Sequence, residues 1–318
     1  MKPVSIILDT DMGADYDDAG ALATLHALED LGEARILAVG ASNQLPYSVP
    51  LIEVINRYYG KPAIPVGAVK GKAATIDTWH KGEKWTHELP IHYFHAVPTT
   101  RDAPDAITVF RSVLAAQPDQ SVVLVTIGFF TNLGHLLDSP PDKFSPLTGK
   151  QLVQKKVVRV VSMAGKFPSG KETNVIVDPE NARKVFAEWP GEMVISGYEI
   201  GRFVRTGDRL IQMPVTKNPV KDAYAMSIAQ DKLETDNSRY EPGGRASYDQ
   251  TAVLAAVRTP ETYFGLERGT FVVQNDGSNT WHPNATGTHW RLLEKTKPQA
   301  LAGVIEDLMM KAPASRNP

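Results

Sequence analysis

Five aspartates lie within ten residues near the N-terminus, directly after a short apolar segment. They are Asp9, Asp11, Asp15, Asp17 and Asp18. Carboxylates at this density repel one another, and a hard divalent cation bound through oxygen atoms would offset that repulsion. An alternative is that Asp17 or Asp18 caps the next helix while the others stay in solvent. A cap uses one carboxylate and leaves the rest unexplained, so we expect this segment to bind a metal ion.

The chain has 318 residues and a formal net charge of −2, which hides an uneven distribution of charge. Residues 1–34 carry eight acids and a single base, Lys2, whereas the rest of the chain carries a net charge of +5. A hydrophobic fraction of 42% with 22% charged residues is typical of a globular protein. The absence of cysteine excludes disulfides, zinc–thiolate sites and a cysteine nucleophile.

Composition also argues against two classes of partner. A pI near 6.5 without long basic runs disfavours nucleic acid as the main partner, and no apolar run is long enough to cross a membrane. The N-terminus shows no apolar signal segment with a cleavage site. This favours a cytoplasmic protein, although a chain trimmed of its signal would look the same.

The order of apolar segments predicts an α/β fold. Strands are expected at 4–8, 35–41, 63–69, 121–127, 157–163 and 193–196, and helices at 21–31, 51–59, 103–116, 131–137, 179–189, 222–233, 249–257 and 298–310. Residues 70–100, 234–247 and 275–290 are expected to form loops. Strands that alternate with helices indicate a mostly parallel sheet flanked by helices, and we interpret residues 1–318 as a single domain. Ligands of such sheets bind beyond the carboxyl ends of the strands, where the aspartates lie.

The aspartate segment resembles a known motif. Asp9-x-Asp11-x-Gly13, followed by Asp17-Asp18-Ala19, is similar to the Asp-x-Asp-Pro-Gly-x-Asp-Asp signature of the inosine/uridine-preferring nucleoside hydrolases. Met12 replaces the usual Pro, and two extra residues precede the Asp pair, as in a variant branch of that family. The extra residues leave the role of Asp15 open, with metal binding as one possibility.

Four later features match the same family in chain order. They are Asn43 after the second strand, Gly128-Phe129-Phe130-Thr131-Asn132-Leu133 after a central strand, Glu172-Thr173-Asn174 followed by Asp178-Pro179, and Tyr248-Asp249-Gln250-Thr251-Ala252-Val253. Each of these motifs alone is weak, but their joint occurrence in the expected order is specific.

The resemblance implies a calcium-dependent hydrolase that cleaves the N-glycosidic bond of ribonucleosides, or of a related N-riboside. It implies metal ligands at Asp11, Asp18, Asp249 and the backbone carbonyl of Ile127. Asp11 would also remove a proton from the attacking water. The ribose would be held by Asp17, Asn43, Glu172, Asn174 and Asp249. Family members are often homodimers or homotetramers, and we expect one of these states.

The group that protonates the leaving base stays open. Tyr248 stands where purine-cleaving members often place a His, and a tyrosine with a pKa of about 10 is a poor acid at neutral pH. Its ring would instead stack on the base. Trp281 and His289 are further pocket candidates, as are the histidines of residues 70–100.

Two other hypotheses compete with the interpretation as a nucleoside hydrolase. A strand followed by Asp-x-Asp also opens the haloacid-dehalogenase-like phosphatases, in which Asp9 would be the nucleophile and magnesium the metal. Met12 fits that family poorly, and the Asp17-Asp18 doublet has no place in it. The second hypothesis is a nucleoside- or sugar-binding protein that has lost turnover because Tyr248 replaces the residue that protonates the leaving base.

Overall fold

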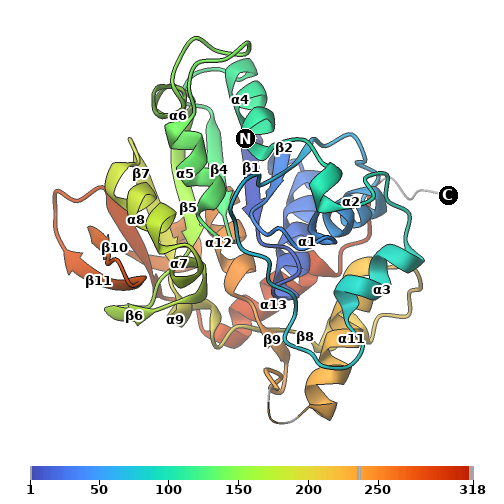
Figure 1. Ribbon diagram of the computed structural model, residues 1–318. Coiled ribbons are helices and arrows are strands. Elements are labelled where there is room, and N and C mark those ends of the chain that lie inside the picture. Colours follow the sequence, from blue (N-terminus) through green and yellow to red (C-terminus); the bar gives the residue numbers. More distant parts are fainter. Residues whose placement is uncertain (1, 235, 237, 315–318) are drawn as a thin grey trace.

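The computed structural model describes residues 2–234, 236 and 238–314, and its centre is one large sheet (Figure 1). The ten strands lie in the order β3-β2-β1-β4-β5-β7-β12-β10-β11-β6. Their bounds are β1 Val4–Thr10, β2 Ala34–Ala41, β3 Val66–Ala68, β4 Val122–Thr126, β5 Val157–Met163, β6 Ser169–Lys171, β7 Glu192–Ser196, β10 Phe264–Val273, β11 Ser278–Pro283 and β12 His289–Glu294. Each pair of neighbouring strands from β3 to β12 in this order is parallel. The three remaining pairs, β12–β10, β10–β11 and β11–β6, are antiparallel. The predicted α/β fold with a mostly parallel sheet is confirmed.

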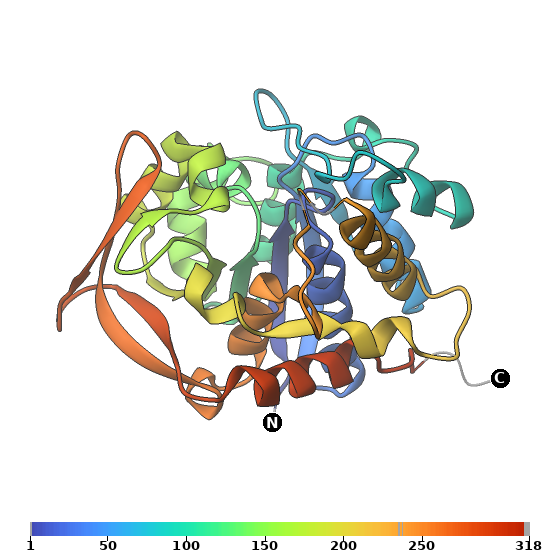
Figure 2. The ribbon, with the colours of Figure 1, turned by 90° about the horizontal axis from the view of Figure 1, so that it is seen from below.

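The strand order reverses direction at β1. The chain moves outward from β1 through β2 to β3 and then returns to place β4 on the other side of β1. This reversal opens a crevice at the carboxyl ends of β1 and β4, the usual ligand site of an open parallel sheet. In Figure 2 the blue loops and the orange segment before α12 come together at that end of the sheet.

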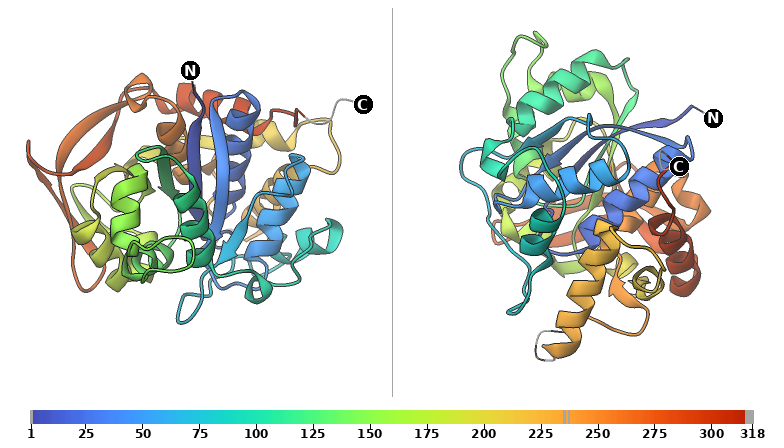
Figure 3. Two further views of the ribbon diagram at one scale, coloured as in Figure 1. Left: turned by 90° about the horizontal axis from the view of Figure 1, so that it is seen from above. Right: turned by 90° about the vertical axis from the view of Figure 1, so that its right-hand side faces the viewer.

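Helices cover both faces of the sheet (Figure 3). One face packs against α1 (Asp17–Asp30), α2 (Ser48–Tyr58), α12 (Tyr248–Val257) and α13 (Pro298–Met309), and the other against α4 (Ala106–Ala116), α5 (Thr131–Asp138) and α8 (Pro179–Glu188). The strands of the central sheet are nearly continuous apolar runs, as expected for strands buried on both faces.

The remaining elements complete the fold. They are α3 (Trp85–His92), η1 (Thr100–Asp102), α6 (Gly149–Lys156), α7 (Thr173–Val177), α9 (Tyr198–Gly201), α10 (Asp208–Ile211), α11 (Pro219–Leu233), η3 (Pro260–Thr262) and the separate strand pair β8 (Arg205–Gly207) and β9 (Gly244–Ala246). Helix α3 lies within residues 70–100, where the sequence pattern predicts only loop. None of the helices formed by the described residues is long and apolar enough to cross a membrane.

The C-terminal strands differ from the sequence expectation. The pattern predicts a polar loop at residues 275–290, yet these residues contain β11 and the start of β12, and β10 precedes them. Buried residues such as Phe271 and Val273 alternate with more exposed ones, because one face of this hairpin is solvated. The hairpin also supports the crevice, since β11 pairs with β6, which leads directly into α7.

Candidate active site

A cavity of about 680 Å³ occupies the crevice at the carboxyl ends of the central strands. Its floor is acidic. Asp11, Asp17, Asp18 and Asp249 line it, and each side chain is at most 5% exposed. Residues separated by more than 230 positions in the chain therefore meet in one buried cluster.

Glycine makes this approach possible at two positions. Gly13 takes a φ of +111°, which turns the chain out of β1 toward α1. Gly128 follows β4, and a Cβ there would lie 2.3 Å from the backbone nitrogen of Asp11. The ends of β1 and β4 pack this closely only because residue 128 has no side chain. The Gly-x-x-Thr-Asn-Leu segment thus serves the site through its backbone.

Three carboxylates form the tightest group. Oxygen atoms of Asp17, Asp18 and Asp249 all lie within 4.8 Å of one another. The Asp17 carboxylate accepts hydrogen bonds from the backbone N–H groups of Tyr248 (3.1 Å) and Asp249 (3.3 Å), so it caps the start of α12 and fixes Asp249 beside it. The Thr10 hydroxyl donates to one oxygen of Asp18.

This group has the properties of a cation site. Burial, followed by repulsion between neighbouring carboxylates, raises the pKa values of Asp17, Asp18 and Asp249 well above the usual range. The second oxygen of Asp18 is buried and has no hydrogen-bond partner in the described part of the chain. An unpartnered carboxylate oxygen among several buried acids fits a hard cation such as calcium, which prefers oxygen ligands.

Asp11 lies beside this group rather than in its tightest part. It lines the cavity, and burial, together with the charge of Asp17, raises the pKa of its carboxyl well above the usual range. The family resemblance implies Asp11 among the metal ligands and Asp17 on the ribose, whereas the most compact set of oxygens contains Asp17.

The side-chain amide of Asn43 donates to the backbone carbonyls of Asp11 (3.1 Å) and Ile76 (2.7 Å). Asn43 thus holds the Asp11 backbone from behind and does not line the cavity.

The opposite wall comes from the end of β4 and the start of α7. Ile127, Glu172 and Asn174 line the cavity there. The Asn174 side chain donates to the carbonyl of Ile127 over 3.1 Å. Glu172 accepts from the backbone N–H groups of Asn174 (2.8 Å) and Gly165 (3.0 Å), yet burial raises its pKa to about 7. The sequence-predicted Ile127, Glu172 and Asn174 are therefore brought together with the aspartates.

The two extra residues of the aspartate motif have separate partners. Asp15 pairs with Arg245 through the Nε atom at 3.1 Å and through Nη2, so its carboxylate faces a cation within the chain. Tyr16 donates its hydroxyl to Asp231 (3.0 Å), which also accepts from the indole of Trp79 at 3.1 Å. Asp15 remains outside the tight group of Asp17, Asp18 and Asp249.

Comparison with known proteins now identifies the fold family. The sequence model described as inosine-uridine preferring nucleoside hydrolase matches residues 6–303. The chain belongs to this nucleoside hydrolase family. A comparison with curated proteins finds no match.

Three solved structures illustrate the range of similar proteins. A plant nucleoside hydrolase, PpNRh1, shares 17% identity and a TM-score of 0.70, covering 97% of this chain and 99% of its own. A purine-preferring ribonucleoside hydrolase from Gardnerella vaginalis shares 17% identity and a TM-score of 0.69, covering 96% and 99%. The type III effector XopQ, solved with adenosine diphosphate ribose, shares 15% identity and a TM-score of 0.70, covering 98% and 95%. At these identities the likeness establishes the fold.

Tyr248, the residue before Asp249, occupies the position from which the sequence resemblance implies contact with the leaving base. Tyr248 lines the cavity and stacks on Tyr198, with ring centroids 5.3 Å apart. Burial raises the pKa of Tyr248 well above the usual tyrosine range, which makes it a weaker acid still. Of the residues that the structure describes, no histidine lines the cavity. His80 bonds to Asp231 at 3.1 Å, and His289 accepts from the Phe271 N–H at 2.9 Å.

The structure does not bring Trp281 to the cavity. Its side chain is buried in the core on the other face of the sheet, and its indole N–H donates to Glu267 at 2.7 Å. The ring packs on Phe167, with 5.5 Å between centroids. Trp281 thereby supports the segment that leads to Glu172 instead of touching a ligand.

Backbone contacts of β11 add to this support. The backbone N–H of Trp281 donates to the carbonyl of Pro168 at 2.8 Å, and the Asn279 side chain donates to the carbonyl of Lys166 at 2.8 Å. Strand β11 therefore holds the Glu172 segment in place although the two are more than 100 residues apart in the chain.

The roles of several residues in and around the site were missed at the sequence level. Asn132 donates to the buried Asp9 at 2.7 Å and so fixes the acid beneath the floor. Arg245 is the counter-ion of Asp15, and further basic side chains line the cavity mouth. For the basic residues, the local signal was the presence of two arginines, Arg239 and Arg245, in the predicted loop 234–247, and it does not indicate where their side chains point.

Proposed function

We propose that this protein hydrolyses the N-glycosidic bond of ribonucleosides, or of a related N-riboside, in a calcium-dependent reaction that yields free base and ribose. The observation that carries the proposal is the convergence of Asp17, Asp18 and Asp249 in one buried group, beside Asp11 and the Ile127 carbonyl. Membership of the nucleoside hydrolase family supports it.

The proposed roles of the acids and the amide follow from their positions in the cavity. Asp11 lines the floor beside the cation site, where it would accept a proton from the attacking water. A bound calcium ion would polarise that water and orient the ribose hydroxyls. Asp18, Asp249 and the Ile127 carbonyl would supply oxygen ligands, and Asp17 is close enough to contribute to the metal or to a ribose hydroxyl. Glu172 and Asn174, on the opposite wall, would hold the far side of the sugar.

The charge of the floor suits the transition state of this reaction. When the bond between the base and the ribose breaks, positive charge develops on the ribosyl group. Fixed carboxylates around that position stabilise it without reorganisation, because they are already in place and shielded from water. The same carboxylates would repel one another without a cation, so we expect the reaction to require calcium.

Among the described residues of this cavity there is no histidine to protonate the leaving base, and Glu172, with its pKa raised to about 7, lies on the wall assigned to the sugar. Tyr248 is a weak acid here, and the described histidines lie elsewhere. We therefore expect the enzyme to favour ribosides whose leaving group departs without prior protonation. The stacked rings of Tyr198 and Tyr248 would contact that group.

The test compares two substrates with and without calcium. 4-Nitrophenyl riboside has an activated leaving group and inosine does not, so we expect the first to be cleaved faster, with EDTA abolishing both reactions. Reducing sugar and free base are measured together. If neither riboside is cleaved at saturating calcium, the hydrolase proposal is wrong, and binding of inosine without turnover would then establish a binding protein. Release of phosphate from a phosphorylated substrate without release of base would instead establish a phosphatase.

A further inference from the structure

The charge of the side chains that line the cavity changes from negative at its floor to positive at its mouth. Carboxylates line the floor, whereas the basic residues that line the cavity are Lys171, Arg202, Arg205, Arg239 and Arg245. Arg245 belongs to the floor, since it is buried and paired with Asp15. The other four stand on two sides, with Lys171 at the end of β6 and the three arginines around β8 and the segment before β9. A neutral nucleoside has no group that requires such a mouth.

The arginines carry more charge than their acidic neighbours offset. Arg202 and Arg205 contact the same oxygen of Glu241, at 2.8 Å for Arg202. The Glu241 side chain is 46% exposed, so water screens its charge, and a single carboxylate serves two guanidinium groups. The Nε atom of Arg205 is buried and has no hydrogen-bond partner among residues 2–234, 236 and 238–314. A buried donor without a partner next to an open cavity indicates a missing acceptor.

The third arginine is held by stacking. The guanidinium of Arg239 lies 4.0 Å from the ring centroid of Trp79, and no carboxylate pairs with it within the described part of the chain. Trp79 is itself fixed by its hydrogen bond to Asp231, and Arg205 donates to the Arg239 carbonyl at 3.3 Å. Stacking leaves the edge of a guanidinium free to donate, so this arrangement orients Arg239 in advance of binding.

The mouth is close to the floor. Arg205 lies directly across the β8–β9 pair from Ala246, two residues before Tyr248 and three before Asp249. The Trp79 ring centroid lies 4.0 Å from the guanidinium of Arg239 and 5.4 Å from that of Arg245. Arg245 in turn lies 5.5 Å from the ring centroid of Tyr248, so a row of side chains connects Arg239 with the floor. A ligand that places its ribose on the floor would therefore bring an attached group to the arginines.

We propose that the ligand of this cavity is a phosphorylated riboside, whose phosphate is bound at the mouth by Arg202, Arg205 and Arg239. Guanidinium groups bind phosphate through paired, charge-assisted hydrogen bonds, and the unpartnered Arg205 donor supplies one of them. The proposal rests on the proposed function for the placement of the ribose, and it extends that function from nucleosides to nucleoside phosphates.

Binding of inosine and inosine 5′-monophosphate, measured by calorimetry at saturating calcium, tests the proposal. We expect the monophosphate to bind at least about tenfold more tightly, and the difference to shrink as salt is added. The double variant Arg202→Gln/Arg239→Gln should lower the affinity for the monophosphate at least about tenfold more than the affinity for inosine. Arg35→Gln, which removes an exposed arginine far from this cavity, is the matched control and should alter neither affinity.

Other results of these binding measurements would overturn the phosphate site or separate it from the hydrolase proposal. Equal affinities for the two ligands, or equal losses in the double variant, would overturn the proposal and leave the arginines a structural role. Inorganic phosphate that binds as tightly as the monophosphate would also overturn it, because the anion would then bind without the riboside. Turnover separates this proposal from the hydrolase proposal. Tighter binding of the monophosphate without any hydrolysis supports the phosphate site and contradicts the hydrolase, whereas hydrolysis of inosine with no preference for phosphate does the reverse.

Discussion

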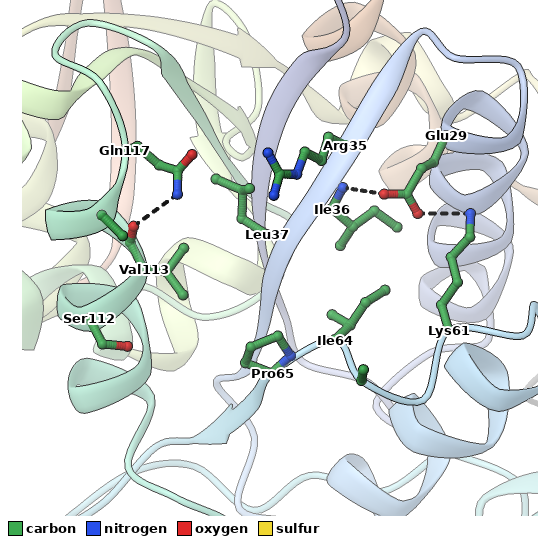
Figure 4. A pocket seen from close by; sticks show the side chains of 12 residues that line it. Glu29, Arg35, Ile36, Leu37, Lys61, Ile64, Pro65, Ser112, Val113 and Gln117 are labelled. Atoms are coloured by element: carbon green, nitrogen blue, oxygen red, sulfur yellow. Dashed lines mark hydrogen bonds and ion pairs between the residues drawn. The ribbon is translucent and has the colours of Figure 1, made fainter.

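Two cavities lie at opposite ends of the parallel strands, and their charges are arranged differently. The candidate active site is at the carboxyl ends. The other cavity, of about 550 Å³, lies near the amino end of β2 and is lined by Glu29, Arg35 and Lys61 among others (Figure 4). Lys61 pairs with Glu29 at 2.8 Å and with Asp30 at 2.6 Å, and Glu29 also accepts the Ile36 N–H at 2.8 Å. At this second cavity both acids pair with Lys61, whereas in the first cavity the acids exceed their basic partners.

Helix α1 connects the two cavities. Its first turn carries Asp17 and Asp18, where the positive end of the helix dipole favours negative charge, and its last turn carries Glu29 and Asp30, where the dipole disfavours it. Burial works to raise the pKa of Asp30, but the hydrogen bond from Lys61 lowers it below the usual range. Unpaired buried charge, rather than volume, therefore distinguishes the candidate active site from the second cavity.

The largest expected effect is on catalysis at the first cavity. Asp11→Asn preserves the shape of the side chain but removes the proposed proton acceptor, so kcat for riboside cleavage should fall by about 100- to 10,000-fold. Release of free base measures the change. Arg35→Gln at the second cavity serves as the control and should leave kcat unchanged. An Asp11→Asn variant with more than half of the parent activity would refute the proposed role of Asp11.

A second expected effect concerns the ion pair between Asp15 and Arg245. Arg245→Met leaves Asp15 without this partner next to the buried Asp17, and should lower the free energy of unfolding by about 3 to 5 kcal/mol. Urea unfolding measures it. The double variant Asp15→Asn/Arg245→Met removes both charges and should recover much of the loss. If the double variant is as unstable as Arg245→Met, lost packing rather than unpaired charge is responsible.

The comparison also explains which features the sequence could predict. The aspartate segment, the turn before Thr131 and the Asp249 helix each carry their information locally, because the chemistry and the turn geometry lie within about ten residues. Those elements form in the expected places and do meet in one cavity. The parallel strands were predictable for the same reason, since burial on both faces leaves an apolar run.

Long-range pairings left no such local signal. The partner of Asp15 is Arg245, 230 residues away, and neither local sequence contains a pattern that identifies the other residue as its partner. The polar stretch around Trp281 suggests a pocket residue, but that stretch is a half-solvated hairpin whose inward face buries the indole. Which face a side chain takes depends on strand register, and register depends on partners elsewhere in the chain.

A third expected effect is stabilisation by calcium, which should occur through the first cavity. At a free concentration 100 times its Kd, calcium should raise the free energy of unfolding by about 2.7 kcal/mol. Asp18→Asn should lose this response, and in EDTA it should be no less stable than the parent, because it removes a buried negative charge that its neighbours repel. Thermal unfolding with calcium or EDTA measures both. A parent protein that calcium does not stabilise would contradict the assigned cation site.

A smaller effect is expected at the middle of α1, between the cavities. His26 is buried, bonds to Asn56 at 2.8 Å, and its pKa is lowered by burial from 6.5 to about 3. Between these values the unfolded chain binds a proton that the native state does not, so stability falls as the pH drops below 6.5, by at most about 1.4 kcal/mol per pH unit. His26→Gln keeps a hydrogen-bonding group but removes the titration. Its stability should fall less steeply than that of the parent from pH 6.5 to 5, and an identical slope would contradict the neutral state of His26.

The smallest effect is expected at the second cavity, and it decides whether the comparison holds. Lys61→Met removes the base that pairs with Glu29 and Asp30, but the lysine side chain is 24% exposed and water can take over part of its role. The free energy of unfolding should therefore fall by about 1 kcal/mol or less, and added salt should reduce the difference further. Calcium should stabilise Lys61→Met as much as it does the parent. A loss as large as that of Arg245→Met would show that both cavities depend on buried charge to the same degree, and unpaired charge would then no longer distinguish the binding site.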